Sequence, residues 1–276
     1  MLVLGDVCST YFGILRIESH DALAAALLGG FQLTATLSIL SFLRCVFTKP
    51  GRTPYLDPPQ VPLAELKFCE HCSQWKPPRT HHCRVCGMCI HRVRTRQMDH
   101  HCQWVNNCVA IKTHKFFLLF LLYFVVAGIM GSGAMAYVAT GYILGRKVHL
   151  IYLLIDGIGA VLGTFFSMVC LVLLCEQLLN TSRNQVQLEE WQGASPSSGP
   201  LLQNLEAVFG TNHWAWMLPL KPALKLDYQE PLLQGHAERF QGKTALCYRA
   251  ALGIGVALSL IGVAAALCWH FQAYIL

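Results

Sequence analysis

The chain has 276 residues, of which 54% are hydrophobic and only 13% charged, and its formal net charge is +6. Soluble domains usually carry about a quarter charged residues, so this composition argues against an ordinary soluble protein. The charges are segregated, because the stretch from Thr48 to Lys115 is polar and basic whereas several other stretches are long and apolar. This segregation indicates membrane helices around one soluble module.

Four apolar runs are long enough to cross a bilayer, which takes about 20 residues in a helix. We predict membrane helices at residues 22–47, 116–144 and 150–179, and an extra one at 250–270. A buried helix of a soluble protein is the alternative for each run, but four such runs argue against it. Residues 1–21 are too short and polar for a convincing span, so we interpret them as an N-terminal segment or a truncated first span.

The distribution of basic residues predicts the orientation. Residues 48–115 hold 11 Lys and Arg against 4 Asp and Glu, and residues 176–249 hold 6 more basic residues. Segments rich in Lys and Arg beside membrane helices usually face the cytoplasm. We therefore expect the module at 48–115 and the C-terminal region at 180–249 to be cytoplasmic.

Cysteines and histidines cluster inside the predicted module. Seven of the 13 cysteines lie between Cys69 and Cys108, where histidines separate C-x2-C pairs. This pattern is typical of zinc ligands in a reducing compartment, since zinc takes four Cys or His ligands in a tetrahedron. Two such sites need eight ligands, and six cysteines with two histidines supply them: Cys69, Cys72, Cys83, Cys86, Cys89 and Cys108. One cysteine is left over.

The remaining cysteine ends the run Asp99-His100-His101-Cys102. An imidazole beside a thiol favours the nucleophilic thiolate, and a carboxylate can hold that imidazole in the tautomer that accepts the proton. The alternative is a third metal site or an inert Cys/His pair. The position of Cys102 favours the catalytic interpretation. Cys102 lies 14 residues before Phe116, where a span is predicted to begin, so its thiolate would lie at the bilayer surface and could meet an activated acyl chain that is buried in lipid. The basic surroundings suit an acyl donor that carries several phosphates.

From Cys69 to Phe117 the sequence closely resembles the DHHC family of protein S-acyltransferases, also called palmitoyltransferases. The residues that match the family are Cys69, Cys72, Lys76, Pro77, Arg79, His82, Cys83, Cys86, Cys89, Asp99, His100, His101, Cys102, Trp104, Asn107, Cys108, Val109 and Phe117. Weaker similarity extends from about Ala22 to Gly210. There, Asn204 to Gly210 resembles the family's C-terminal motif, whose asparagine supports the fold near the membrane.

The resemblance implies an α-helical polytopic membrane protein whose cytoplasmic cysteine-rich module is built of loops and β-hairpins and holds two structural zinc ions. It implies that the first zinc binds Cys69, Cys72, His82 and Cys89. The second zinc would bind Cys83, Cys86, His101 and Cys108. It also implies that Cys102 carries an acyl thioester, with His100 as the base and Asp99 as the residue that orients it.

We therefore predict a protein-cysteine S-palmitoyltransferase with ping-pong kinetics. Its acyl donor would be palmitoyl-CoA or a related fatty acyl-CoA, and its acceptors would be cysteines of membrane-associated proteins at the lipid bilayer. The family suggests the ER or Golgi membrane. A nucleic-acid-binding zinc finger is disfavoured, because the module is tethered between spans and lacks a recognition-helix pattern, so no nucleic acid partner is expected.

The alternative function is a zinc-stabilised membrane adaptor with impaired catalysis, and several departures from the family motivate it. Nine residues separate Cys89 from Asp99, where the family usually has four, so we interpret Val93 to Gln97 as an insert. It is expected to bulge out as a basic loop, but could equally shift His101 and weaken the second site. Other family positions are substituted: Gln103 replaces a proline, Ala110 a glycine, Thr113 an asparagine, and Val186 and Gln187 replace threonines.

Overall fold

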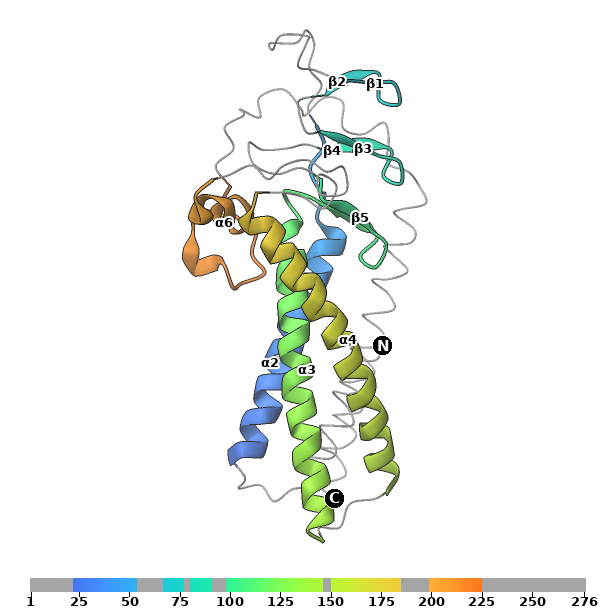
Figure 1. The fold of residues 1–276 in the computed structure, drawn as a ribbon, viewed down its shortest axis with the longest axis vertical. Helices are drawn as coiled ribbons and strands as arrows, with labels where there is room; N and C mark the ends of the chain where they lie inside the picture. Colours follow the sequence, from blue (N-terminus) through green and yellow to red (C-terminus); the bar gives the residue numbers. More distant parts are fainter. Residues whose placement is uncertain are drawn as a thin grey trace, which may run out of the picture. The chain divides into compact units, whose positions relative to one another are not determined.

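The computed structural model describes residues 22–53, 67–76, 80–90, 98–145, 150–184 and 199–224 (Figure 1). The predictions for the N-terminal segment, for the insert at 93–97, for the substituted threonines and for an extra span at 250–270 lie outside these residues. The chain forms two compact units. Of the described residues, the first unit comprises 22–39, 120–145 and 150–173, and the second comprises 40–53, 67–76, 80–90, 98–119, 174–184 and 199–224.

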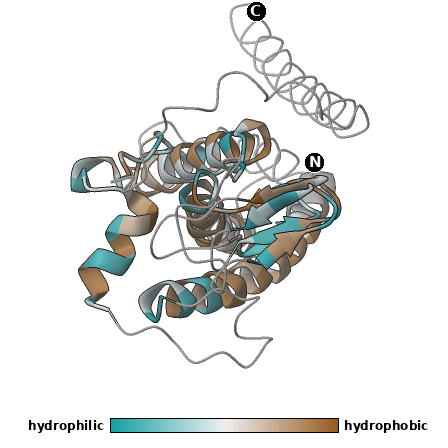
Figure 2. Ribbon diagram, turned by 90° about the horizontal axis from the view of Figure 1, so that it is seen from above, coloured by the Kyte–Doolittle hydropathy of each residue, from teal (hydrophilic) through white to brown (hydrophobic). Residues whose placement is uncertain are grey.

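Three long helices dominate the described chain, namely α2 (Ala22–Phe47), α3 (His114–Ile143) and α4 (Leu150–Ser182). Each contains a stretch long and apolar enough to cross a membrane: Gly29–Phe47, His114–Ile143 and Gly157–Ser182. Figure 2 shows hydrophobic residues along the long helices and more hydrophilic ones on the strands. The predicted fold class, a helical membrane protein with a hairpin module, is confirmed.

In the first unit, small residues let the helices approach closely. Phe31 and Ala35 of α2 pack against Ala127 and Met130 of α3, in a cluster whose buried members are less than 5% exposed. A hydroxyl pair, Ser132 Oγ and Thr164 Oγ1 at 3.0 Å, joins α3 to α4. Such small and hydroxyl side chains are the usual means of helix association in lipid, where burial of apolar surface supplies no driving force.

The second unit contains three short antiparallel hairpins, which Figure 1 shows one above another. They pair β1 (Lys67–Cys69) with β2 (Gln74–Lys76), β3 (His81–Cys83) with β4 (Met88–Ile90), and β5 (His100–Cys102) with β6 (Asn107–Val109). All three share one plan. Each has three residues per strand and a four-residue loop whose last residue adopts positive φ: Ser73, Gly87 and Asn106.

The third hairpin is tied to the ends of two helices. The buried side chain of Asn107 donates hydrogen bonds to the carbonyls of Cys45 and Thr48, both at 2.8 Å, at the end of α2. Thr113, which directly precedes α3, donates to the carbonyl of Cys108 at 2.7 Å and accepts from the backbone N–H of Ala110 at 2.9 Å. These bonds satisfy backbone groups that helix ends and loops would otherwise leave unpaired.

The second unit also includes a C-terminal segment with helix α6 (Leu201–Phe209) and the 3₁₀ turn η2 (His213–Ala215). Asn204, 2% exposed, donates to the carbonyl of Ser182 at the end of α4 over 2.8 Å. Lys115, fully buried, donates through Nζ to the carbonyl of Ala215 over 2.6 Å. The asparagine thus supports the fold beside a helix end, as expected from the resemblance.

Candidate functional site

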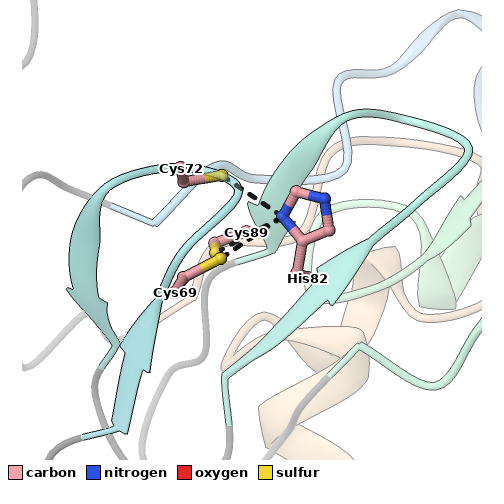
Figure 3. A group of neighbouring side chains, drawn as sticks. All are labelled: Cys69, Cys72, His82 and Cys89. Atoms are coloured by element: carbon pink, nitrogen blue, oxygen red, sulfur yellow. Dashed lines mark hydrogen bonds between the residues drawn. The ribbon is translucent and has the colours of Figure 1, made fainter.

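The first Cys/His cluster is formed by the loop of one hairpin and the strands of the next (Figure 3). Cys69 ends β1 and Cys72 lies in its loop, while His82 and Cys89 are a cross-strand pair of β3 and β4. The Nδ1 atom of His82 lies 3.2, 3.6 and 3.9 Å from the sulfurs of Cys72, Cys69 and Cys89.

The second cluster repeats this arrangement one hairpin further along. Cys83 ends β3 and Cys86 lies in its loop, while His101 and Cys108 are a cross-strand pair of β5 and β6. The Nδ1 atom of His101 lies 3.4 to 3.6 Å from all three sulfurs. Zinc bonds of about 2.0 Å to nitrogen and 2.3 Å to sulfur give tetrahedral N···S edges of about 3.5 Å. Both donor sets therefore fit zinc, and their ligand atoms all lie within 4.8 Å of one another.

The structure thus brings together the two sets of four residues that the resemblance implied. The four residues of the second set lie together although the chain carries the insert. The insert therefore does not shift His101 away from its three partners. Thr113 and Ala110, two of the departures from the family, are buried and hydrogen-bonded to each other in the loop before α3. Gln103 is exposed in the third hairpin loop.

The third hairpin has the same loop but only one of the two loop cysteines. Cys102 ends β5 as Cys69 ends β1 and Cys83 ends β3, but Val105 occupies the position of the second cysteine. In the second hairpin the backbone N–H of Cys86 donates to the sulfur of Cys83 over 3.3 Å. The backbone N–H of Val105 occupies the corresponding place in the third loop, where it lowers the pKa of Cys102. Cys102 therefore has the backbone of a zinc knuckle without its second thiol.

Strand alternation separates the metal ligands from the remaining thiol. Successive side chains of a strand point to opposite faces, so His101 and its partner Cys108 lie on one face of the third hairpin. His100 and Cys102 lie on the other face, where Cys102 pairs across the strands with Asn107. The sequence order His-His-Cys thus gives one imidazole to the metal cluster and one to the thiol.

Asp99, His100 and Cys102 form a hydrogen-bonded series. The Oδ2 atom of Asp99 accepts a hydrogen bond from Nδ1 of His100 over 2.8 Å, and Asp99 is 2% exposed. The imidazole also hydrogen-bonds the thiol of Cys102, which is 6% exposed. The ring of His100 packs edge-on against Phe117 of α3, with centroids 5.6 Å apart. The helix thereby holds the imidazole from its other side.

The electrostatics of this series favour a thiolate beside an imidazolium. Burial disfavours the charged ring, but hydrogen bonds with Asp99 and Cys102 outweigh it and raise the pKa of His100 to about 9. Burial also raises the pKa of the Cys102 thiol, yet hydrogen bonds from His100 and from the N–H groups of Val105 and Trp104 bring that pKa below its ordinary value. A thiolate is the reactive form of cysteine.

Two further polar residues extend the series, Gln177 through direct contact with Asp99 and His114 through Gln177, and sequence reasoning assigned neither of them to this site. Gln177 of α4 donates to Asp99, and it hydrogen-bonds His114, the first residue of α3. A signal was present in the sequence. Buried polar residues recur at helical spacing along the end of α4 and just beyond it: Gln177, Asn180, Thr181 and, two residues past the helix, Asn184. Buried polar residues in a membrane helix often have a functional or structural partner.

The fold and site define a protein with three helices able to span a membrane, two Cys/His clusters that fit a metal ion, and a separate cysteine beside a histidine. A sequence model of the DHHC palmitoyltransferase family matches residues 63–194. Probable protein S-acyltransferase 12 of Arabidopsis thaliana is 30% identical over 246 residues, which cover 78% of this chain and 80% of the relative. Palmitoyltransferase ZDHHC15 of Rattus norvegicus is 32% identical over 169 residues, covering 56% of this chain and 47% of the relative.

The chain belongs to the DHHC palmitoyltransferase family. Probable protein S-acyltransferase 14 of Arabidopsis thaliana is also similar, with 36% identity over 159 residues that cover 45% of this chain and 49% of the relative. Membership of this family, together with three helices able to span a membrane, supports a membrane-bound acyltransferase.

Proposed function

We propose that this protein is a protein-cysteine S-palmitoyltransferase. It moves a long-chain fatty acyl group from acyl-CoA, through Cys102, to cysteines of membrane-associated proteins. The observation that carries the proposal is a thiol outside both metal clusters that is hydrogen-bonded by His100 and by two backbone N–H groups. The names of the relatives support protein S-acylation as the reaction class.

In the first step, the Cys102 thiolate attacks the carbonyl carbon of the acyl-CoA thioester. The new C–S bond to Cys102 forms as the bond to the CoA sulfur breaks, and His100 gives the departing thiolate its proton. Asp99 keeps Nδ1 of His100 protonated and hydrogen-bonded, so Nε2 is the nitrogen that exchanges the proton with sulfur. The products are acyl-Cys102 and free CoA.

In the second step, a cysteine thiol of the acceptor protein attacks the acyl-Cys102 carbonyl. His100 takes the proton of the incoming thiol, and the Cys102 thiolate is released, which restores the starting enzyme. Covalent catalysis of this kind divides one difficult encounter into two and gives ping-pong kinetics.

The two zinc ions have a structural role in this proposal. Cys69, Cys72, His82 and Cys89 would hold the first ion, and Cys83, Cys86, His101 and Cys108 would hold the second. A zinc ion would supply cross-links between hairpins whose three-residue strands are too short to be stable alone. The chain's own contribution is to place Cys102 beside His100 and next to the start of α3.

The basic module suits a phosphate-bearing donor at a membrane surface. Its excess of Lys and Arg supports a cytoplasmic orientation, the side where acyl-CoA and acceptor cysteines meet. We propose the ER or Golgi membrane as its location.

The test is acyl-enzyme formation by the purified protein with an alkyne-labelled palmitoyl-CoA. The parent is expected to form a hydroxylamine-labile adduct on Cys102, and Cys102→Ala is expected to form none. Cys175→Ala, which removes an exposed cysteine of α4, is the matched control and should label like the parent. Equal labelling of Cys102→Ala, or a label that resists hydroxylamine, would contradict the mechanism. Two bound zinc ions with no adduct would favour the adaptor.

A further inference from the structure

The cytoplasm-proximal end of α4 carries a buried amide that contacts the proposed catalytic residues. Gln177 is 3% exposed, and its Nε2 donates to Oδ2 of Asp99 over 2.7 Å. The same oxygen accepts the hydrogen bond from Nδ1 of His100 over 2.8 Å. A carboxylate only accepts, so the NH₂ group of the amide must face Asp99. The amide oxygen of Gln177 is then directed away from it.

His114 fixes the other end of this amide. Its Nε2 lies 2.9 Å from Oε1 of Gln177, and His114 is 4% exposed. An amide oxygen only accepts, so His114 must carry a proton on Nε2 and donate it. Hydrogen bonds therefore run without a break from the start of α3, through the end of α4, to Asp99 and His100.

We propose that Gln177 is a positioning residue for acyl transfer, acting through Asp99, with His114 fixing the orientation of its amide. This inference rests on the proposed function, because it assumes that His100 is the base and that Asp99 orients it. Helix packing alone does not require an amide here, since an apolar side chain of the same length would fill the space. Hydrogen bonds to a buried carboxylate are among the stronger ones in proteins, so Gln177 restricts where Asp99 can hold the imidazole.

Two substitutions at one position separate positioning from packing. Gln177→Met keeps the length and unbranched shape of the side chain but removes both hydrogen bonds. Gln177→His keeps a donor, because its Nε2 stands as many bonds from the backbone as the amide nitrogen of glutamine. We expect Gln177→Met to lower the maximal rate of Cys102 acylation about tenfold. The half-saturating palmitoyl-CoA concentration and two bound zinc ions per chain should be unchanged, and Gln177→His should recover most of the rate.

Asn180→Met is the matched control, because Asn180 is a second buried amide about one turn further along α4. In the Asn180→Met variant, the rate of Cys102 acylation per zinc-loaded chain should equal that of the parent. The inference is overturned if Gln177→Met acylates like the parent, if its rate falls only in proportion to lost zinc, if Gln177→His recovers nothing, or if Asn180→Met loses as much. If the parent forms no hydroxylamine-labile adduct, the proposed function fails and this inference with it. If the parent acylates and Gln177→Met matches it, this inference alone fails.

Discussion

At the scale of single residues, the site depends on a buried carboxylate whose Oδ2 serves two donors, His100 and Gln177. The aspartate, the histidine and the thiol are neighbours in sequence, so their pattern alone predicted that they could form a series. Gln177 could not be predicted in this way. Its contact with Asp99 joins residues 78 apart in the chain and depends on how α4 packs, which no local spacing encodes.

Asp99→Asn should test the role of the carboxylate. The amide keeps the shape of the side chain but removes its charge and allows His100 to be held in the wrong tautomer. The acylation rate of Cys102 is therefore expected to fall about 10²- to 10⁴-fold while zinc content is retained. Glu70→Gln, in the exposed loop of the first hairpin, is the control for loss of an acid and should acylate normally. Single-turnover labelling measures both, and a parent-like rate for Asp99→Asn would contradict the assigned role.

At the scale of secondary-structure elements, the module is one hairpin plan used three times. The apolar runs predicted the three described helices because a membrane span has a fixed minimum length. The hairpins were expected only from the resemblance, since strands of three residues are too short for an alternating pattern to be recognised. The structure adds why Cys102 lies outside both Cys/His clusters. Its loop has Val105 where the other two loops have a second cysteine.

Val105→Cys should turn the third loop into a metal-binding knuckle. The substitution places a second thiol at the C-x2-C spacing that zinc favours, on a backbone that already donates an N–H to the first sulfur. We expect extra zinc to be bound and acylation to be lost when zinc is in excess. Removal of the weakly held zinc with a mild chelator should restore acylation, and Val105→Ala should show neither effect. Inhibition that persists without the extra zinc would count against this interpretation.

At the scale of the whole molecule, the loops of the first two hairpins each meet the central cross-strand pair of the next hairpin. Composition and basic segments predicted a membrane protein with a separate polar module, and the family resemblance predicted which ligands share a zinc. Without the resemblance, the residues left the pairing of ligands between successive hairpins open, because it depends on which face each strand residue occupies. The third hairpin connects this series to the ends of α2 and α3.

Loss of either zinc should therefore have unequal effects. Cys86→Ser opens the site that includes His101, next to Cys102, whereas Cys72→Ser opens the site one hairpin away. Each variant should lose one zinc, and we expect acylation to fall roughly tenfold further in Cys86→Ser than in Cys72→Ser. Metal analysis with single-turnover labelling checks this ranking. Equal losses of acylation in the two variants would mean that removing either zinc disrupts all three hairpins.

The ladder between β5 and β6 is only three residue pairs long, yet it decides which way the nucleophile points. A slip by one residue would exchange the two faces, directing the thiol at the metal and the metal-binding imidazole at the substrate. The bond network of Asn107 at the end of α2 resists that slip from outside the ladder. Lengthening the loop at 103–106 by a single residue should thus abolish acylation of Cys102, although every chemically reactive side chain is still present.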